Sequence, residues 1–337
     1  MSSSDKPFQA ERSTQFDHML LKYVIEPIWR LIPRSVTPNS ITLLTPVFAG
    51  VSFILAASAP EMSPTAALLA RVFAGVCMFC SMITDHLDGM HARRTRQTSR
   101  LGEVLDHALD AIHIPLASAG VAMTLGASPG LVMLIIVTNA MVYNAQLIVY
   151  HHTRKFVFPP SGGASTQVLL ASAYVSLGVF LYLFPAELAW VSIVLTLLAW
   201  SIVFVQSRQI LFFVPYLRGW SGHLLRFTAK AAGVATLCMW GALGTTLAAT
   251  LLVLLSFRIT GSYVLFTVVN RPYDGVDRGL IFGLAAIAAT HAPVAMGVST
   301  LDLSSYLALA LCGYLVARNL ADVARFLPEL TGKRRAA

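Results

Sequence analysis

The sequence predicts an all-α polytopic membrane protein with about ten transmembrane helices, preceded by an amphipathic helix that lies in the membrane interface. Hydrophobic residues make up 56% of the 337-residue chain and charged residues only 12%, with a mean hydropathy of +0.69. A soluble protein of this length would be less apolar. The net charge of +8 comes from basic residues at the ends of apolar runs, a pattern typical of membrane orientation. We therefore expect no nucleic-acid partner.

The amphipathic helix is expected near the start of the chain. Apolar and polar residues separate onto two helix sides, with Phe16, Met19, Leu20, Tyr23 and Val24 on one and Asp17, His18, Lys22 and Glu26 on the other. Thr14 is a candidate N-cap, and Pro27 and Pro33 are expected to break the helix. Residues 1–39 would then form a cytoplasmic arm that contains this helix.

Ten apolar runs follow, most of them near the ~20 residues that cross ~30 Å of hydrocarbon. They cover residues 41–58, 65–86, 104–126, 130–150, 166–184, 188–211, 230–243, 246–269, 279–298 and 303–323. The seventh run is short, and Arg258 interrupts the eighth. With ten spans, the basic loop from His91 to Leu101 and the basic C-terminus fall on one side, which the positive-inside rule makes cytoplasmic.

Four acids stand within the second and third helical segments, where an apolar chain should have none: Asp85, Asp88, Asp106 and Asp110. An ionised carboxylate at membrane depth costs several kcal/mol unless it is paired, hydrated or bound to a cation. On its helix, Asp110 shares a stripe with Asp106, Glu103 and His107. Two such helices facing each other would make an oxygen-lined cage of the kind that Mg²⁺ prefers, with room for phosphates.

These residues carry a resemblance to a known family. The chain contains Asp85-x2-Asp88-Gly89-x2-Ala92-Arg93-x8-Gly102-x3-Asp106-x3-Asp110. This pattern resembles the signature of the CDP-alcohol phosphotransferases, membrane enzymes that transfer a phospho-alcohol or phosphatidyl group from a CDP donor and release CMP. Four further segments resemble the choline/ethanolamine branch: Ala92-Arg93-Arg94-Thr95, Leu101-Gly102-Glu103, Asp106-His107 and Pro38-Asn39-Ser40-Ile41-Thr42.

The resemblance implies a division of the chain. Residues 40–213 would form a six-helix catalytic bundle, and residues 214–325 an accessory four-helix membrane bundle. A Pro/Gly break with basic and aromatic residues, Pro215 to Gly222, marks the boundary. Residues 326–337 would be a basic cytoplasmic tail. We also expect two copies of the chain to form a homodimer.

The resemblance also implies roles for the site residues. Asp85, Asp88, Asp106 and Asp110 would hold the cofactor, two Mg²⁺ or Mn²⁺ ions that neutralise the donor phosphates. Binding of the CDP donor would involve Asn39, Asp88, Gly89, Ala92, Arg93 and Gly102. Gly89 and Ala92 let a nucleotide approach the backbone, and the Arg93 guanidinium can pair with phosphate. The small side chains of Gly89 and Ala92 could instead serve close helix packing, and the two roles are compatible.

Two residues are candidates for the catalytic base. His107 has an ordinary pKa near ~6.5 and lies one turn from Glu103, which could orient it. In the choline/ethanolamine branch the matching Glu and His are implicated in catalysis, whereas the wider family points to the last acid, here Asp110. Both assignments stay open at this point.

The head group and the acceptor also stay open. The choline/ethanolamine branch carries an acid in a Gly-Pro-rich stretch. The corresponding residues here contain no acid: Pro159-Pro160-Ser161-Gly162-Gly163-Ala164-Ser165. A choline site would need aromatic faces, for which Tyr143, Tyr150 and Trp190 are available.

We therefore expect a CDP-alcohol donor such as CDP-choline or CDP-ethanolamine, a lipid alcohol acceptor from the bilayer such as diacylglycerol or ceramide, and an active site at the cytoplasmic face. The alternatives are a phosphatidyltransferase that uses CDP-diacylglycerol, and a divalent-cation transporter. Clustering of the acids near one loop argues against the transporter.

Overall fold

The computed structural model describes residues 15–153, 157, 159, 164–184, 188–217, 221–272, 277–298 and 301–331. The predicted Thr14 cap, residues 160–163 and the basic residues after Thr331 lie outside this part of the chain. Its elements are α1 (Gln15–Leu20), a π-helical segment (Leu21–Ile25), α2 (Glu26–Arg30), α3 (Pro38–Thr42), α4 (Leu44–Ser58), α5 (Pro64–Thr95), α6 (Arg100–Thr124), α7 (Pro129–Thr153), α8 (Ala164–Leu183), α9 (Ala189–Phe213), α10 (Ser221–Met239), α11 (Thr245–Val268), α12 (Arg278–Ala295) and α13 (Ser304–Leu330).

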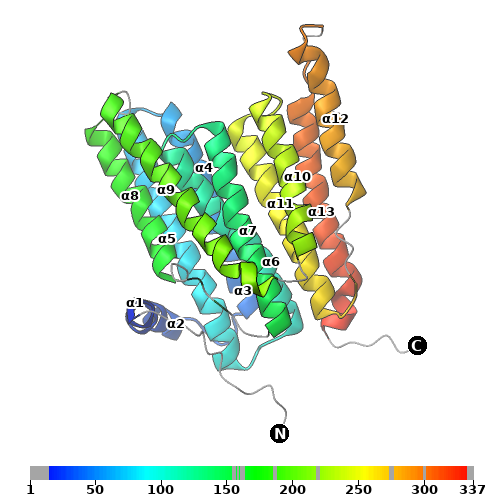
Figure 1. Cartoon of the computed structure of the whole chain (residues 1–337). Helices are drawn as coiled ribbons and strands as arrows, with labels where there is room; N and C mark the ends of the chain where they lie inside the picture. Colours follow the sequence, from blue (N-terminus) through cyan, green and yellow to red (C-terminus); the bar gives the residue numbers. More distant parts are fainter. Residues whose placement is uncertain are drawn as a thin grey trace.

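The all-α polytopic fold is confirmed. Each of the ten predicted runs corresponds to one helix from α4 to α13, and these helices alternate in direction through one layered bundle (Figure 1). By length and composition, eight segments of the described chain can cross a membrane, and they contain α4, α5, α7, α8, α9, α11, α12 and α13. The other two long helices, α6 and α10, run beside these and are not among the eight.

The outer surface of the bundle is apolar. On α9, one face carries large side chains at helical spacing that are 48–64% exposed: Trp190, Ile193, Leu197, Trp200 and Phe204. A soluble protein would not leave such a stripe in water, whereas hydrocarbon surrounds it at no cost. The surface of the described chain therefore fits a bilayer as its solvent.

Helix α6 lies in the interior of the bundle, where it contacts α4, α7, α8 and α11. Small residues make this possible. At Gly120, an added Cβ would collide with the hydroxyl of Tyr174 on α8, and that hydroxyl donates a hydrogen bond of 3.1 Å to the carbonyl of Ala117. Gly261 of α11 also packs against α6, because a Cβ added there would be 3.3 Å from the Cβ of Ala108.

Arg258, which interrupts the eighth run, is the centre of a buried ion network. Its Nε donates to Asp277 at 2.9 Å and its Nη1 to Asp322 at 2.7 Å. Burial opposes the charge of Asp277, but hydrogen bonds from Arg258, Tyr314 and the Leu280 N–H hold the pKa of its carboxyl below the usual value. The network joins α11 to the start of α12 and to α13, so the charge that weakens the apolar run is fully paired.

Three expected boundaries were wrong. Helix α5 continues to Thr95, so the basic loop shrinks to residues 96–99; it stops where Arg96 takes a left-handed φ of 58° and its N–H returns to Ala92. Helix α10 begins at Ser221, nine residues before the predicted start at residue 230, because its polar first turns lower the hydropathy without breaking the helix. Helix α13 runs to Leu330, into the range assigned to the tail.

The amphipathic helix forms across the lower end of the bundle, beside α5 (Figure 1). The expectation that Pro27 breaks it was wrong. The chain stays helical to Arg30, and the Glu26 N–H bonds the Leu21 carbonyl, five residues back. This π-type shift accommodates a proline that has no N–H to give. Phe16, Met19 and Tyr23 of the predicted apolar side are exposed.

We predict that Gly120→Ala destabilises the protein by about 1–3 kcal/mol, because the added methyl group must displace Tyr174 from α6. Thermal unfolding of the purified protein in detergent measures this. Gly50→Ala is the matched control, since nothing lies within 4 Å of a Cβ added at that glycine of α4. Equal stability of the two variants would contradict the close packing of α6 against α8.

Candidate active site

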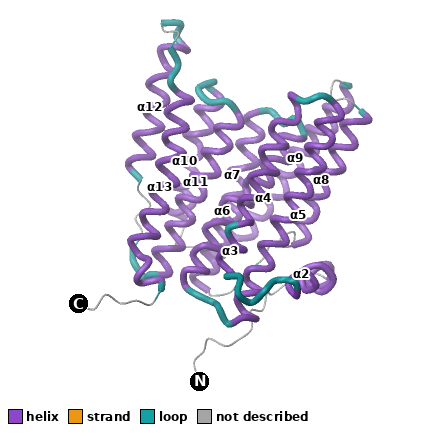
Figure 2. The backbone as a smooth tube through the Cα atoms, turned by 180° about the vertical axis from the view of Figure 1, so that it is seen from behind, coloured by secondary structure: helices purple, strands orange, loops and turns teal. Residues whose placement is uncertain are grey.

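The site forms where α5 and α6 meet at the lower end of the bundle (Figures 1 and 2). The turn between them is short because both ends are capped. The Ser99 hydroxyl accepts a hydrogen bond of 3.0 Å from the Gly102 N–H and so starts α6 immediately after the left-handed Arg96 ends α5. The antiparallel pair therefore brings the acids at the end of α5 opposite those at the start of α6.

Asp85 of α5 and Asp110 of α6 meet at the centre of this site. Their carboxylate oxygens and a ring nitrogen of His113 all lie within 4.8 Å of one another. Two neighbours donate to the acids. Gln167 Nε2 of α8 lies 3.3 Å from Asp85 Oδ2, and the Tyr143 hydroxyl of α7 lies 3.1 Å from Asp110 Oδ2.

The other two aspartates extend the cluster toward the end of the bundle. Asp88 is buried, and its Oδ1 accepts a short hydrogen bond of 2.5 Å from the Gly89 N–H. The Asp106 side chain is 39% exposed and marks the open side of the site. All four carboxylates lie near enough to act electrostatically on Asp110 or Asp106. Of the four predicted metal ligands, the structure brings Asp85 and Asp110 within ligand distance of one another, and Asp88 and Asp106 border that pair.

This donor set fits a hard divalent cation. Two carboxylates ~4 Å apart repel by about 4 kcal/mol at an effective dielectric of 20, and Gln167 and Tyr143 are neutral donors that do not cancel the charge. Carboxylate oxygens converging from two helices are the ligands that Mg²⁺ and Mn²⁺ take in proteins. Asp85, Asp88, Asp106 and Asp110 are the residues that would hold the ion.

The predicted donor-binding residues form two pairs at the edge of the cluster. The Arg93 guanidinium folds back over Gly89, where an added Cβ would be 3.0 Å from Arg93 Nη1. Asn39 of α3 occupies the space beside Gly102, where a Cβ would be 3.3 Å from Asn39 Oδ1. Both glycines therefore lie in close contact with side chains of this chain, and a larger residue at either position would have to push that side chain aside. Ala92, one residue before Arg93, is half-buried.

His107 lies on the side of α6 that faces α7. Its ring, 5% exposed, packs edge-on against Tyr150 with 5.3 Å between ring centroids. Its Nδ1 is 3.8 Å from Asp106 Oδ2. Glu103 is half-buried in the first turn of α6, one turn before His107. Both candidate bases thus border the acid cluster, with His107 beside Asp106 and Asp110 opposite Asp85.

Three residues beside the acids are not among the predicted site residues. His113 follows Asp110 at i+3 on α6, a spacing that could have indicated it. Tyr143 was considered only as an aromatic face, and Gln167 carries no local signal because it comes from α8. Trp190, the third aromatic residue considered for a choline site, packs on Phe180 and Phe184 near the start of α9, at the other end of the bundle.

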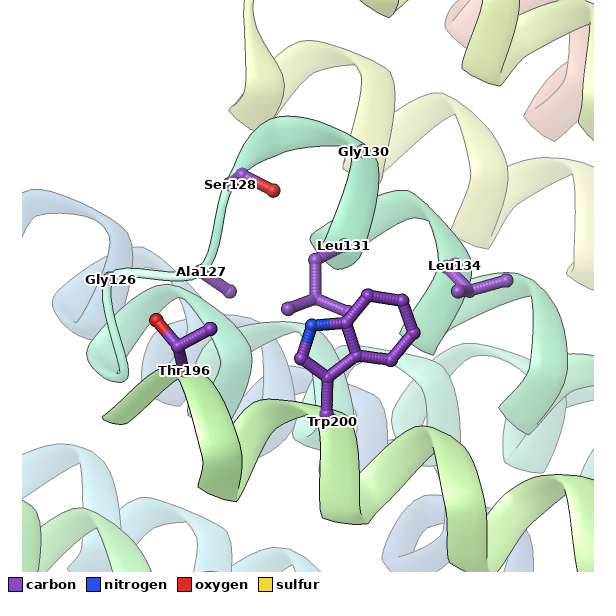
Figure 3. Close-up of a pocket in the computed structure, with 8 residues that line it drawn as sticks. All are labelled: Gly126, Ala127, Ser128, Gly130, Leu131, Leu134, Thr196 and Trp200. Carbon is purple, nitrogen blue, oxygen red and sulfur yellow. The ribbon is translucent and has the colours of Figure 1, made fainter. Parts of the chain in front are cut away.

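A pocket of about 470 Å³ lies at that other end, between the α6–α7 turn and α9 (Figure 3). Its lining comprises Gly126, Ala127, Ser128, Gly130, Leu131, Leu134, Thr196 and Trp200. None of these side chains titrates, and about 24 Å of α6 separates the pocket from Asp110 at 1.5 Å per residue. It has no part in the acid cluster.

Comparison with known proteins places the site in a family. A model of the CDP-alcohol phosphatidyltransferase family matches residues 35–205. The chain is similar to choline/ethanolaminephosphotransferase 1 of Arabidopsis thaliana (35% identity; 33% of this chain and 29% of that one). It is also similar to cholinephosphotransferase 1 of Gallus gallus (30%; 37% and 39%) and to CDP-diacylglycerol–serine O-phosphatidyltransferase of Encephalitozoon cuniculi (33%; 42% and 38%). The alignments span less than half of each relative. The family model covers half of the chain and contains every acid of the site, so the chain belongs to the CDP-alcohol phosphatidyltransferase family.

Proposed function

We propose that this chain is an enzyme of phospholipid biosynthesis that transfers a phospho-alcohol head group, phosphocholine or phosphoethanolamine, from a CDP-alcohol to a lipid hydroxyl such as that of diacylglycerol. The observation that carries this proposal is the meeting of Asp85 and Asp110 across α5 and α6, in a cluster of four carboxylates within an apolar bundle. The printed names of two relatives, both head-group transferases, support the choice of donor.

In this reaction the lipid hydroxyl oxygen attacks the β-phosphorus of the donor. The bond from that phosphorus to the bridging oxygen breaks, CMP leaves with the electron pair, and the hydroxyl proton passes to a base. Bound Mg²⁺ or Mn²⁺, two ions in our proposal, would neutralise phosphate charge as it develops. Arg93 would bind phosphate and Gly89 and Gly102 would shape the backbone around the donor, with Asn39 beside Gly102.

The proton acceptor is proposed to be His107, oriented by Glu103, with Asp110 as the alternative. His107 is a neutral-pH base at the border of the acid cluster, whereas Asp110 already accepts a hydrogen bond from Tyr143 and faces Asp85. That placement suits Asp110 better to holding the cation.

The division of labour in the chain is also proposed. Helices α4 to α9 would form the catalytic bundle, whereas α10 to α13 would form the accessory bundle and support α6 through α11. The active site would face the cytoplasm. Homodimer formation stays a prediction.

A second candidate is a phosphatidyltransferase that takes the lipid from CDP-diacylglycerol and gives it to a polar alcohol. The similarity to a CDP-diacylglycerol–serine O-phosphatidyltransferase favours it. Both reactions release CMP at the same acids, so the lipid product decides between them. Divalent-cation transport, the third reading, would release no CMP at all.

We expect the purified protein in lipid, supplied with Mg²⁺, to release CMP from CDP-choline or CDP-ethanolamine when diacylglycerol is present. EDTA should abolish release, and Mg²⁺ or Mn²⁺ in excess should restore it. Phospholipid formed only from CDP-diacylglycerol and a polar alcohol would support the second candidate. CMP release that persists in excess chelator would contradict a divalent-cation site.

The two candidate bases are separable. His107→Ala should lower turnover by about 10²–10⁴-fold and leave binding of the CDP donor nearly unchanged, because proton transfer occurs only in the transition state. Asp110→Asn should weaken cation and donor binding as well as turnover, since it removes a ligand charge. Turnover and equilibrium donor binding are measured side by side. Near wild-type turnover in His107→Ala would move the base to Asp110.

The cytoplasmic location predicts the outcome of labelling. Ser2→Cys and Ala337→Cys should resist an impermeant thiol reagent in intact cells and react once the cells are permeabilised. The parent chain is the control, because its own cysteines lie inside helices α5, α10 and α13. Reaction of either terminus in intact cells would show that the number of spans or their orientation is different.

A further inference from the structure

A buried histidine beyond the motif points into the acid cluster. His113 lies one turn after Asp110 on α6, and it is 1% exposed. Neither of its ring nitrogens makes a hydrogen bond within the described part of the chain. A buried polar group without a hydrogen bond costs about 1–3 kcal/mol, so it calls for an explanation such as a bound water, a bound ion or a catalytic role. No position of the family motif corresponds to His113, since that motif ends at Asp110.

The geometry around His113 is that of a metal ligand. Its Nδ1 lies 3.4 Å from Asp110 Oδ1, which is beyond a good hydrogen bond. Two ligands that each lie ~2.1 Å from one octahedral ion are about 3.0 Å apart when adjacent and about 4.2 Å apart when opposite. The separation of 3.4 Å falls between these values, and Asp85 supplies a further oxygen within 4.8 Å.

We propose that His113 is a nitrogen ligand of the cation held by Asp85 and Asp110. This inference deepens the proposed function, because it takes these two acids as part of the proposed cation site. The site would then have mixed oxygen and nitrogen ligands at Asp85, Asp110 and His113, and only oxygen ligands at Asp88 and Asp106, nearer the turn between α5 and α6.

The consequence is metal selectivity. Mg²⁺ strongly prefers oxygen ligands, whereas Mn²⁺ and the later first-row ions accept imidazole as well as carboxylate. An imidazole at the buried end therefore favours Mn²⁺ over Mg²⁺ at that position. Replacing His113 with a residue that offers only oxygen should reverse the preference.

The test is electron spin-echo envelope modulation spectroscopy. The sample is the full-length protein in lipid with substoichiometric Mn²⁺ and with neither CDP donor nor lipid acceptor. Protein labelled with ¹⁵N only at histidine should show a directly coordinated ¹⁵N nucleus. His113→Gln should lose this coupling while Mn²⁺ still binds, and the Mn²⁺/Mg²⁺ affinity ratio from competition should fall by about tenfold or more. His113→Glu should retain Mn²⁺ binding without nitrogen coupling.

His86→Gln is the matched control. His86 also borders the acids, with its Nδ1 3.7 Å from Asp85 Oδ2, but that nitrogen lies 2.9 Å from the Met82 carbonyl. This variant should keep the nitrogen coupling. Loss of the coupling in His86→Gln and its retention in His113→Gln would assign the ligand to His86 and overturn the proposal.

The outcomes separate this inference from the proposed reaction. Mn²⁺ bound to the wild type without histidine coupling overturns the inference for His113 whether or not any variant folds, and leaves the proposed reaction intact. Coupling that depends on His113 in a protein that releases no CMP from any donor supports the inference and overturns the reaction. If Mn²⁺ does not bind, the cation site fails and the inference fails with it.

Discussion

Buried carboxylate charge has to be compensated within this apolar bundle, and the packing of its central helices follows from how that is done. An ionised acid in a bundle surrounded by hydrocarbon must be paired, hydrated or bound to a cation. The chain meets this requirement in two ways. Among α11, α12 and α13, Arg258 lies between Asp277 and Asp322, with nitrogen–oxygen distances of 2.9 and 2.7 Å. At the end of α5 and α6, Asp85 and Asp110 face each other, and the donors Gln167 and Tyr143 that bond them are neutral and cannot cancel their charge.

The two charge clusters are connected through the packing of α6. Arg258 fastens α11 to α12 and α13, and α11 in turn packs on α6 at Gly261 and Ala108, midway between Asp106 and Asp110. The Arg100 guanidinium also donates to the Val268 carbonyl at the end of α11. On the other side, Tyr174 of α8 fits against Gly120. The helix that carries two of the four aspartates is therefore packed closely on both sides, which a set of ligands needs for a fixed geometry.

Most of the fold could be predicted from the sequence. A segment inside a bilayer must bond all its backbone N–H and C=O groups internally, so a long apolar run indicates a helix. The ten runs from α4 to α13 followed from hydropathy, and the approach of Asp85 to Asp110 followed from the spacing of the acids on two adjacent helices. Helix ends did not, because the left-handed cap at Arg96 and the π-shift before Pro27 depend on local backbone geometry that hydropathy does not see. Within the site, Gln167 comes from α8, 57 residues after Asp110, and only tertiary packing reveals it. Helical spacing alone indicates His113, which lies at i+3 from Asp110, but the family motif ends at Asp110 and does not contain it.

We propose that a divalent cation compensates the charge of the facing carboxylates of Asp85 and Asp110. Thermal unfolding of the wild type and of Asp85→Asn/Asp110→Asn, each in EDTA and across a Mg²⁺ titration, tests it most directly. Mg²⁺ should stabilise the wild type progressively, by about 2.7 kcal/mol at a hundred times the dissociation constant, and leave the double variant nearly unchanged. In EDTA the order should reverse, with the variant more stable because the repulsion between two unit charges is gone. Equal responses to Mg²⁺, or a variant less stable than the wild type in EDTA, would show that no divalent cation compensates Asp85 and Asp110.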